Sequence, residues 1–259
     1  QNNPMFTRSI PPLLALVLIS AAAPLYAQSV EDVITKARAR LGSEEALNNV
    51  ETVQFIGVAI NGQGEVTDDV ILQFKKPTMQ RLTVESDNFK RITATNGFEG
   101  YTEIIDKYDP LSSGIIVHDA ERVRRLIANS LENLYFFRGP YHLRGASVAD
   151  EGMKSIDGEP CHVIRYSYPG DYHYLRRFNA KTGRVVSTIN ISTDFETVEE
   201  GVIEVDGILF PEQINTYDDE GDLIRAVKFN QIIVNQPLDD SLFDFPDVMS
   251  NKSYQDDNE

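Results

Sequence analysis

Cysteine is scarce in this chain, which contains a single one, Cys161, among 259 residues. One thiol excludes an intramolecular disulfide framework and any zinc or iron–sulfur site built from several cysteines. Basic residues are scarce too, since 24 lysines and arginines stand against 40 aspartates and glutamates and give a formal net charge of -16. That charge repels phosphate backbones and no basic stripe offsets it locally, so we expect no nucleic-acid partner.

Motifs that carry catalysis are also missing from the sequence. It has no Gly-x-Ser-x-Gly elbow, no phosphate-cradling glycine loop and no His-Glu-x-x-His pair. Cys161 and His162 are adjacent, but successive strand residues point to opposite faces, which predicts a buried thiol beside an exposed imidazole. Acidic pairs such as Asp68-Asp69 are expected to splay apart into solvent. We therefore expect no enzyme, no cofactor and no metal, with catalysis by unrecognised acidic residues as an alternative.

Long apolar runs are limited to one stretch near the start, Leu13 to Ala23. It follows Arg8 and precedes Pro24, and Ala27 supplies a small residue before the expected cut. This order is typical of a cleaved secretory signal, and the run is too short to span a bilayer comfortably. We expect residues 5–27 to be a signal peptide and the mature chain to be exported and soluble.

The first predicted helix begins the mature chain. Ser29 supplies a hydroxyl cap, Asp32 places a carboxylate in the first turn, and Gly42 ends an apolar pattern of helical spacing. Ser43 caps a short helical continuation over 44–47.

A second amphipathic helix is predicted from Asp119 to about Phe137, where Gly139-Pro140 ends it. Its charged residues Arg122, Arg124, Arg125 and Glu132 are expected to lie largely off the apolar side. That apolar side is expected to be core, or else part of a movable lid over a trough.

The rest of the chain is predicted to form strands separated by glycine, asparagine and aspartate turns. The expected strands cover 52–60, 66–75, 80–85, 89–95, 101–105, 161–168, 172–179, 184–192, 201–205, 208–217 and 222–234. Many neighbouring antiparallel strands and two helices indicate a mainly β (α+β) fold, in which a strongly curved half-barrel sheet carries helices on its concave face. We expect a single domain over 28–249 and an acidic tail over 250–259.

The segment 166–174 is rich in tyrosine. Tyrosines at strand spacing can line an amphipathic pocket or a protein interface, and they also stabilise sheets as cross-strand partners. We favour the stabilising role for this segment.

Three parts of the chain resemble the exported LolA-like family of outer-membrane lipoprotein-sorting proteins. They are the opening helix and its Gly-x-Glu-type continuation over 37–47, the hairpin pattern of 156–164 with 178–186, and the closing strands 207–212 and 235–246. The resemblance implies a LolA/LolB-like half-barrel whose hydrophobic cavity holds acyl chains beneath covering helices. It also implies a periplasmic protein that carries lipid or lipidated cargo without catalysing a reaction.

We accordingly expect a monomeric carrier or binder of lipid or acylated lipoprotein cargo, which exchanges that cargo with an inner-membrane exporter and an outer-membrane acceptor. The residues expected to line or cover its cavity are Val70, Leu72, Phe74, Leu82, Val84, Leu126, Ile127, Leu131 and Leu134. The alternative is an envelope-stress sensor or regulatory interaction domain that uses the same fold and engages a partner through the tyrosine-rich segment.

Overall fold

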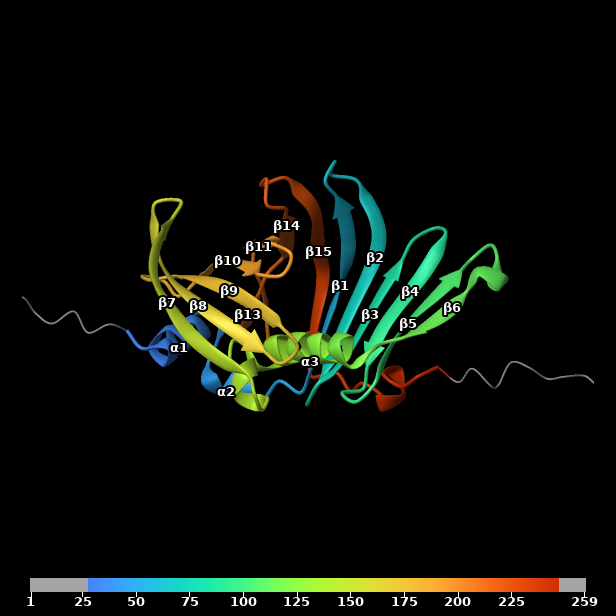
Figure 1. Ribbon diagram of the computed structural model, residues 1–259, viewed down its shortest axis with the longest axis horizontal. Coiled ribbons are helices and arrows are strands. Elements are labelled where there is room, and N and C mark those ends of the chain that lie inside the picture. Colours follow the sequence, from blue (N-terminus) through green and yellow to red (C-terminus); the bar gives the residue numbers. More distant parts are fainter. Residues whose placement is uncertain (1–27, 247–259) are drawn as a thin grey trace, which may run out of the picture.

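The computed structural model describes residues 28–246, so the expected signal peptide and acidic tail lie outside the described residues. Within that range the fold is mostly β, with one open antiparallel sheet of 13 strands and a separate two-stranded sheet. The large sheet has the order β6-β5-β4-β3-β2-β1-β15-β14-β11-β10-β9-β8-β7. Figure 1 shows it as a deeply curved surface with β6 and β7 at its two edges.

The strands of the large sheet are β1 Thr52–Asn61, β2 Val66–Lys75, β3 Met79–Glu85, β4 Phe89–Thr95, β5 Gly100–Asp106, β6 Gly114–Val117, β7 Ser147–Ile156, β8 Glu159–Tyr168, β9 Tyr172–Asn179, β10 Val185–Asn190, β11 Glu196–Glu200, β14 Gln213–Tyr217 and β15 Leu223–Val234. The small sheet pairs β12 Ile203–Val205 with β13 Ile208–Phe210. The α-helices are α1 Val30–Leu41, α2 Glu44–Asn48 and α3 Ala120–Tyr135, and short 3-10 turns cover Pro110–Ser112, Gly139–His142 and Asp240–Leu242.

The helices follow their predicted caps. The Ser29 hydroxyl accepts a hydrogen bond from the Asp32 amide at 3.2 Å, while the Asp32 carboxylate accepts one from the Ser29 amide at 3.0 Å. At α3 the Asp119 carboxylate accepts from the Arg122 amide at 2.8 Å. These bonds satisfy amides that a helix leaves without intrahelical partners, so both predicted starts are confirmed.

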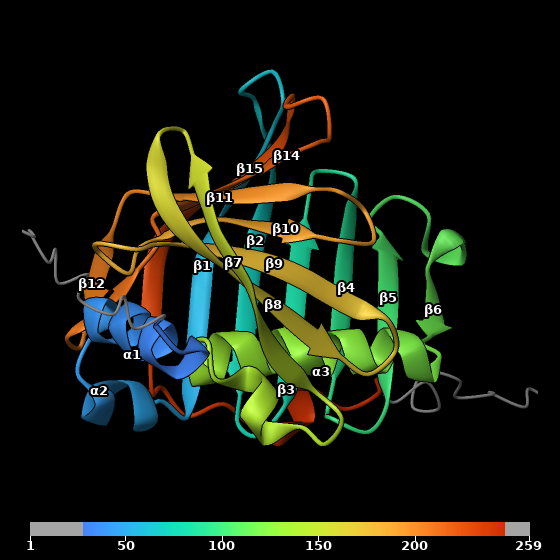
Figure 2. The same ribbon diagram turned by 60° about the vertical axis from the view of Figure 1, so that its left-hand side comes forward.

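Helix α3 lies between the two halves of the curved sheet. It contacts β2, β3 and β4 on one side, and its residues Ala128 and Leu131 share a buried cluster with Ile164 and Tyr166 of β8 on the other. Figure 2 shows β8 and β9 in front of the helix and β1 to β5 behind it. The expected position of a helix on the concave face is therefore confirmed.

A second buried cluster joins early and late elements of the described chain. It gathers residues of α2, β1, β13 and β15 around the C-terminal end of α3, including Leu47, Phe55, Leu134 and Phe229. Arg38 of α1 ties this region to the helix, because its guanidinium donates to the carbonyl oxygens of Tyr135 and Phe136 at 2.8 and 2.9 Å.

The last strand pairs with the first in the middle of the sheet. β15 runs antiparallel to β1, with Val234 opposite Val53, and the register shifts between Ile56 and Gly57. A Cβ atom on Gly57 would lie 2.0 Å from the Lys228 carbonyl oxygen. The two backbones thus approach so closely that only glycine fits at this bulge.

Several strands differ from the prediction. β6, β7 and β11 are additional, and the expected strand 208–217 is two strands that belong to different sheets. It divides at Pro211, which lacks the amide needed to continue a ladder. The sequence pattern did not predict β7, because a bulge between Asp150 and Met153 interrupts the alternation of its side chains.

No helix among residues 28–246 combines the length and the apolarity that crossing a membrane requires.

Candidate functional site

A large hollow of the described structure lies between the concave sheet and the N-terminal half of α3. Its volume is about 910 Å³, and its wall draws side chains from β1 to β6, from β11, β14 and β15, and from the start of the helix. Because side chains alternate along each strand, every second residue of these strands faces it.

Apolar side chains form in-register rows along the wall. Val70 pairs with Val84 across β2 and β3, and Leu72 pairs with Leu82 one step further along the same strands. Leu126 of α3 faces these rows from the opposite side of the cavity. The five side chains present a continuous apolar surface on both sides of the hollow.

Four other residues expected at the cavity lie elsewhere. Phe74, Leu131 and Leu134 are fully buried in the core clusters. Ile127 is partly buried and packs against the cluster that contains Leu131. Phe74 shares a strand face with Val70 and Leu72, but it lies at the end of β2 where the core fills the concavity. Strand alternation identifies the inward face and does not identify where along that face the core stops.

Charged and polar side chains also line the cavity. Arg91, Arg122 and Arg225 come from β4, α3 and β15, and the carboxylates are those of Asp68 and Asp119. These residues were not expected at the site. Arg91 and Asp68 could have been suspected, since they stand at even spacing from inward-facing residues of their own strands.

His118 lies at the cavity wall directly before the cap of α3. Its Nε2 is 2.9 Å from the Thr102 hydroxyl, which in turn lies 2.9 Å from the Thr93 hydroxyl. Its Nδ1 is buried and has no hydrogen-bond partner within the described range. Burial lowers the pKa of this imidazole, as does the charge of Arg122, whereas Asp119 opposes the shift.

An ion pair inside the protein holds α3 against β9. The Arg176 guanidinium donates to Glu132 at 2.9 Å, and the Tyr168 hydroxyl donates to the same carboxylate. The two charged side chains are only 13% and 8% exposed. Glu132 was expected to lie largely off the buried side of its helix. This is wrong, because its carboxylate points into the protein and accepts hydrogen bonds from Tyr168 and Arg176.

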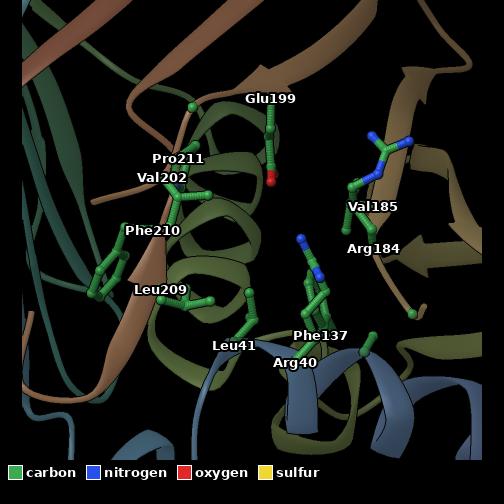
Figure 3. Close-up of a pocket in the computed structure, with 13 residues that line it drawn as sticks. Arg40, Leu41, Phe137, Arg184, Val185, Glu199, Val202, Leu209, Phe210 and Pro211 are labelled. Carbon is green, nitrogen blue, oxygen red and sulfur yellow. The ribbon is translucent and has the colours of Figure 1, made fainter. Parts of the chain in front are cut away.

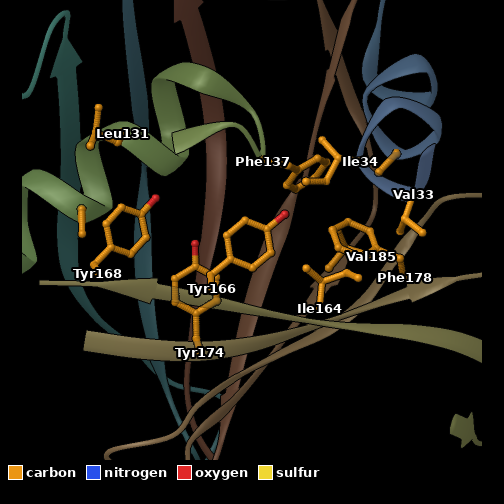
Figure 4. Close-up of a cluster of buried hydrophobic side chains, with 12 residues drawn as sticks. Val33, Ile34, Leu131, Phe137, Ile164, Tyr166, Tyr168, Tyr174, Phe178 and Val185 are labelled. Atoms are coloured by element: carbon orange, nitrogen blue, oxygen red, sulfur yellow. The ribbon is translucent and has the colours of Figure 1, made fainter. Parts of the chain in front are cut away.

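The tyrosine-rich hairpin belongs to the core. Tyr166 and Tyr174 stack with ring centres 5.0 Å apart and are buried, as is Tyr168 (Figure 4). Arg176 lies 5.1 Å from the ring centres of both stacked tyrosines, and burial raises the pKa of both phenols. Such aromatic and cation–π contacts stabilise the hairpin. Tyr166, Tyr168 and Tyr174 are consequently not part of an exposed surface that a regulatory partner could contact.

A second, much smaller hollow of about 80 Å³ lies between α1, β10, β11 and β13. Figure 3 shows the Glu199 carboxylate and the Arg40 guanidinium pointing toward each other across it, with Arg184 at one side. Burial raises the pKa of Glu199, against the opposing charges of Arg176 and Arg184.

The lone thiol and its neighbour are both buried. Cys161 is inaccessible, as expected, and burial raises the pKa of its thiol. His162 was expected to be exposed and is instead buried, and its Nε2 lies 2.9 Å from the Gln28 amide oxygen, which satisfies it. Within residues 28–246, no group of three or more histidine, cysteine, aspartate or glutamate residues has the arrangement of a metal site.

Comparison with known proteins identifies the fold. No protein-family model and no curated protein matches the chain by sequence. Among solved structures, the LolA superfamily protein NE2245 from Nitrosomonas europaea matches with a TM-score of 0.55 and 12% identity, over 85% of this chain and 99% of that one. A DUF1329 family protein from Desulfovibrio piger matches with a TM-score of 0.54 and 11% identity, over 84% and 98% of the two chains.

A third solved structure is a domain from Vibrio parahaemolyticus assigned to outer-membrane lipoprotein sorting, with a TM-score of 0.53 and 7% identity over 82% of this chain and 94% of that one. At these identities the likeness is one of fold. The chain therefore has a LolA-like fold, as its resemblance implied.

Proposed function

We propose that this protein is a periplasmic, non-enzymatic carrier or binder of lipid or acylated protein, and that the cavity beneath α3 holds the apolar part of the cargo. The observation that carries the proposal is a hollow of about 910 Å³ walled by in-register apolar rows. Ligand pockets range from about 300 to 1,000 Å³, so this volume suits a substantial ligand. The LolA-like fold and the secretory signal expected over 5–27 support the same assignment.

Burial of an acyl chain supplies the affinity in this proposal. Each methylene removed from water contributes about 0.8 kcal/mol, so a chain of moderate length along the rows of Val70 and Leu72 binds usefully without any covalent step. The polar groups at the wall do not resemble a nucleophile and base, since the Nδ1 of His118 lacks the third group that would orient the ring.

Cargo entry in this proposal occurs at the N-terminal half of α3. Ser130, Leu131 and Leu134 are fully buried and the Glu132–Arg176 pair anchors the same half, so the C-terminal half is held firmly. Leu126 is the helical residue that borders both the cavity and this anchored part. A lid motion would therefore involve the turns before it, and an inner-membrane exporter and an outer-membrane acceptor would act on this side.

The test is native mass spectrometry of the protein purified from its own periplasm, followed by lipid extraction and by uptake of added lipid. We expect bound lipid on the wild type and a loss of about tenfold in uptake for Leu72→Trp, because the indole occupies space beside the apolar rows where the acyl chain would lie. The matched control is Ile71→Trp. Ile71 is the next residue of β2, it points to the opposite face, and it is 37% exposed.

Two results would reject the proposal. One is a wild-type protein that carries no lipid and takes none up, which would favour an interaction domain. The other is equal uptake by Leu72→Trp and Ile71→Trp, which would place the lipid outside this cavity.

A further inference from the structure

Three arginine side chains in the cavity wall have no partner within the described range. Arg91, Arg122 and Arg225 reach the cavity from a strand, a helix and another strand, and none of their guanidinium groups makes an ion pair or hydrogen bond with another residue of 28–246. All three residues are exposed.

Half of the arginines in the described range form ion pairs. Seven of the fourteen do so, as Arg38 does with Glu44 at 2.7 Å and Arg177 with Glu196 at 2.6 Å. Three of the seven others line this one cavity, beside its apolar rows, although the chain carries a formal net charge of -16.

The carboxylates of the cavity are engaged with other groups. Asp119 accepts the Arg122 amide as the cap of α3, and Asp68 accepts a hydrogen bond from the Thr67 hydroxyl at 2.7 Å. His118, whose pKa is lowered, adds no charge at neutral pH. Three guanidinium groups thus stand against two carboxylates, neither of which is paired with them.

Two of the arginines are placed in ways that favour a ligand. Arg91 lies 5.3 Å from the centre of the Phe89 ring, which orients its guanidinium, and it pairs across the sheet with Val84 of the apolar wall. Arg122 is in the first turn of α3, where the helix dipole disfavours a cation. A bound anion would relieve that unfavourable position.

We propose that the cargo of the cavity is an anionic amphiphile, whose acyl chain lies on the apolar rows and whose headgroup of net negative charge is bound by Arg91, Arg122 and Arg225. This inference rests on the proposed function and specifies its ligand. Guanidinium groups bind phosphate and carboxylate oxygens through paired, charge-assisted hydrogen bonds, which a headgroup carrying its own cation would weaken. Charge and apolar surface thus recognise the two parts of one molecule.

The test compares two single-chain lipids that differ in headgroup charge. Lysophosphatidylglycerol and lysophosphatidylcholine of equal chain length are titrated calorimetrically into the full chain, below their micelle concentrations and at about 0.15 M salt, where exposed charges are screened beyond about 8 Å. Glycerol 3-phosphate is the headgroup-only probe. We expect the wild type to bind the anionic lipid about tenfold more tightly than the zwitterionic one.

The variant Arg91→Gln/Arg225→Gln is expected to lose that preference and to keep its affinity for lysophosphatidylcholine. The matched control is Arg124→Gln/Arg144→Gln, which removes the same charge from exposed residues that do not line the cavity and should keep the preference. Arg122→Gln alone should weaken the preference in part. Thermal melts verify that each variant is folded.

The outcomes separate this inference from the proposed function. Binding of neither lipid overturns both. Equal binding of the two lipids by the wild type, or an undiminished preference in Arg91→Gln/Arg225→Gln, overturns the anionic headgroup and leaves the carrier intact. Glycerol 3-phosphate binding as tightly as the anionic lipid overturns the amphiphile in favour of a site for free anions.

Discussion

At the scale of single residues, the Glu132–Arg176 pair is the feature that pattern alone did not reveal. Helical spacing placed Glu132 off the apolar side of its helix, whereas Arg176 and Tyr168 draw its carboxylate into the protein. The two partners are 44 and 36 residues away along the chain. A contact of that sequence separation depends on how the sheet curves around α3, which local pattern does not encode.

Replacing Glu132 by glutamine should destabilise the protein strongly. The change leaves the Arg176 guanidinium buried without a counter-charge, and removal of one member of a buried pair typically costs about 3–5 kcal/mol. The free energy of unfolding in urea is the measurement. Glu121→Gln is the control, because Glu121 and Arg125 form an exposed pair on the same helix, worth about 1 kcal/mol or less. Similar losses for the two variants would contradict a structural role for the buried pair.

At the scale of elements, local signals predicted the helices better than the strands. Hydroxyl and carboxylate caps determine where α1 and α3 begin. Each cap is a hydrogen bond between residues only three positions apart in the sequence. Strand identity depends on partners far along the chain, which is why β11 and β12 fall in different sheets although they are neighbours in sequence. Five of the nine residues expected at the cavity lie on its wall, whereas Leu131 and Leu134 show that the C-terminal half of α3 is packed in the core.

The two halves should respond differently to truncation. Leu131→Ala opens a void in a filled core and should cost about 4 kcal/mol, whereas Leu126→Ala borders existing space and should cost about 2 kcal/mol. Affinity for a single-chain lipid should fall only for Leu126→Ala. Urea unfolding and lipid titration of both variants measure these effects. A larger loss of stability at Leu126 would show that the N-terminal half is the anchored one.

At the scale of the whole molecule, an occupied cavity should stabilise the fold. A ligand that binds the native state alone adds about 2.7 kcal/mol at a free concentration of one hundred times its Kd. Delipidated protein should therefore melt at a lower temperature than the same protein with added lysophosphatidylglycerol. Leu72→Trp, which binds about tenfold more weakly, should gain only about 1.4 kcal/mol at the same concentration and show a smaller shift. A shift of equal size in Leu72→Trp would indicate lipid bound at the surface instead of in the cavity.

The pairing of β1 with β15 has a consequence for how the molecule forms. Val53 and Val234 face each other in the centre of the sheet, although nearly the whole described chain separates them. Because β15 follows every other strand of the described chain, the two halves of the sheet cannot join until this strand is in place. Contacts between residues so far apart in sequence form slowly. Until β15 pairs with it, β1 has one edge without hydrogen-bond partners. β15 thus completes the large sheet, and truncation before Leu223 would leave two separate half-sheets.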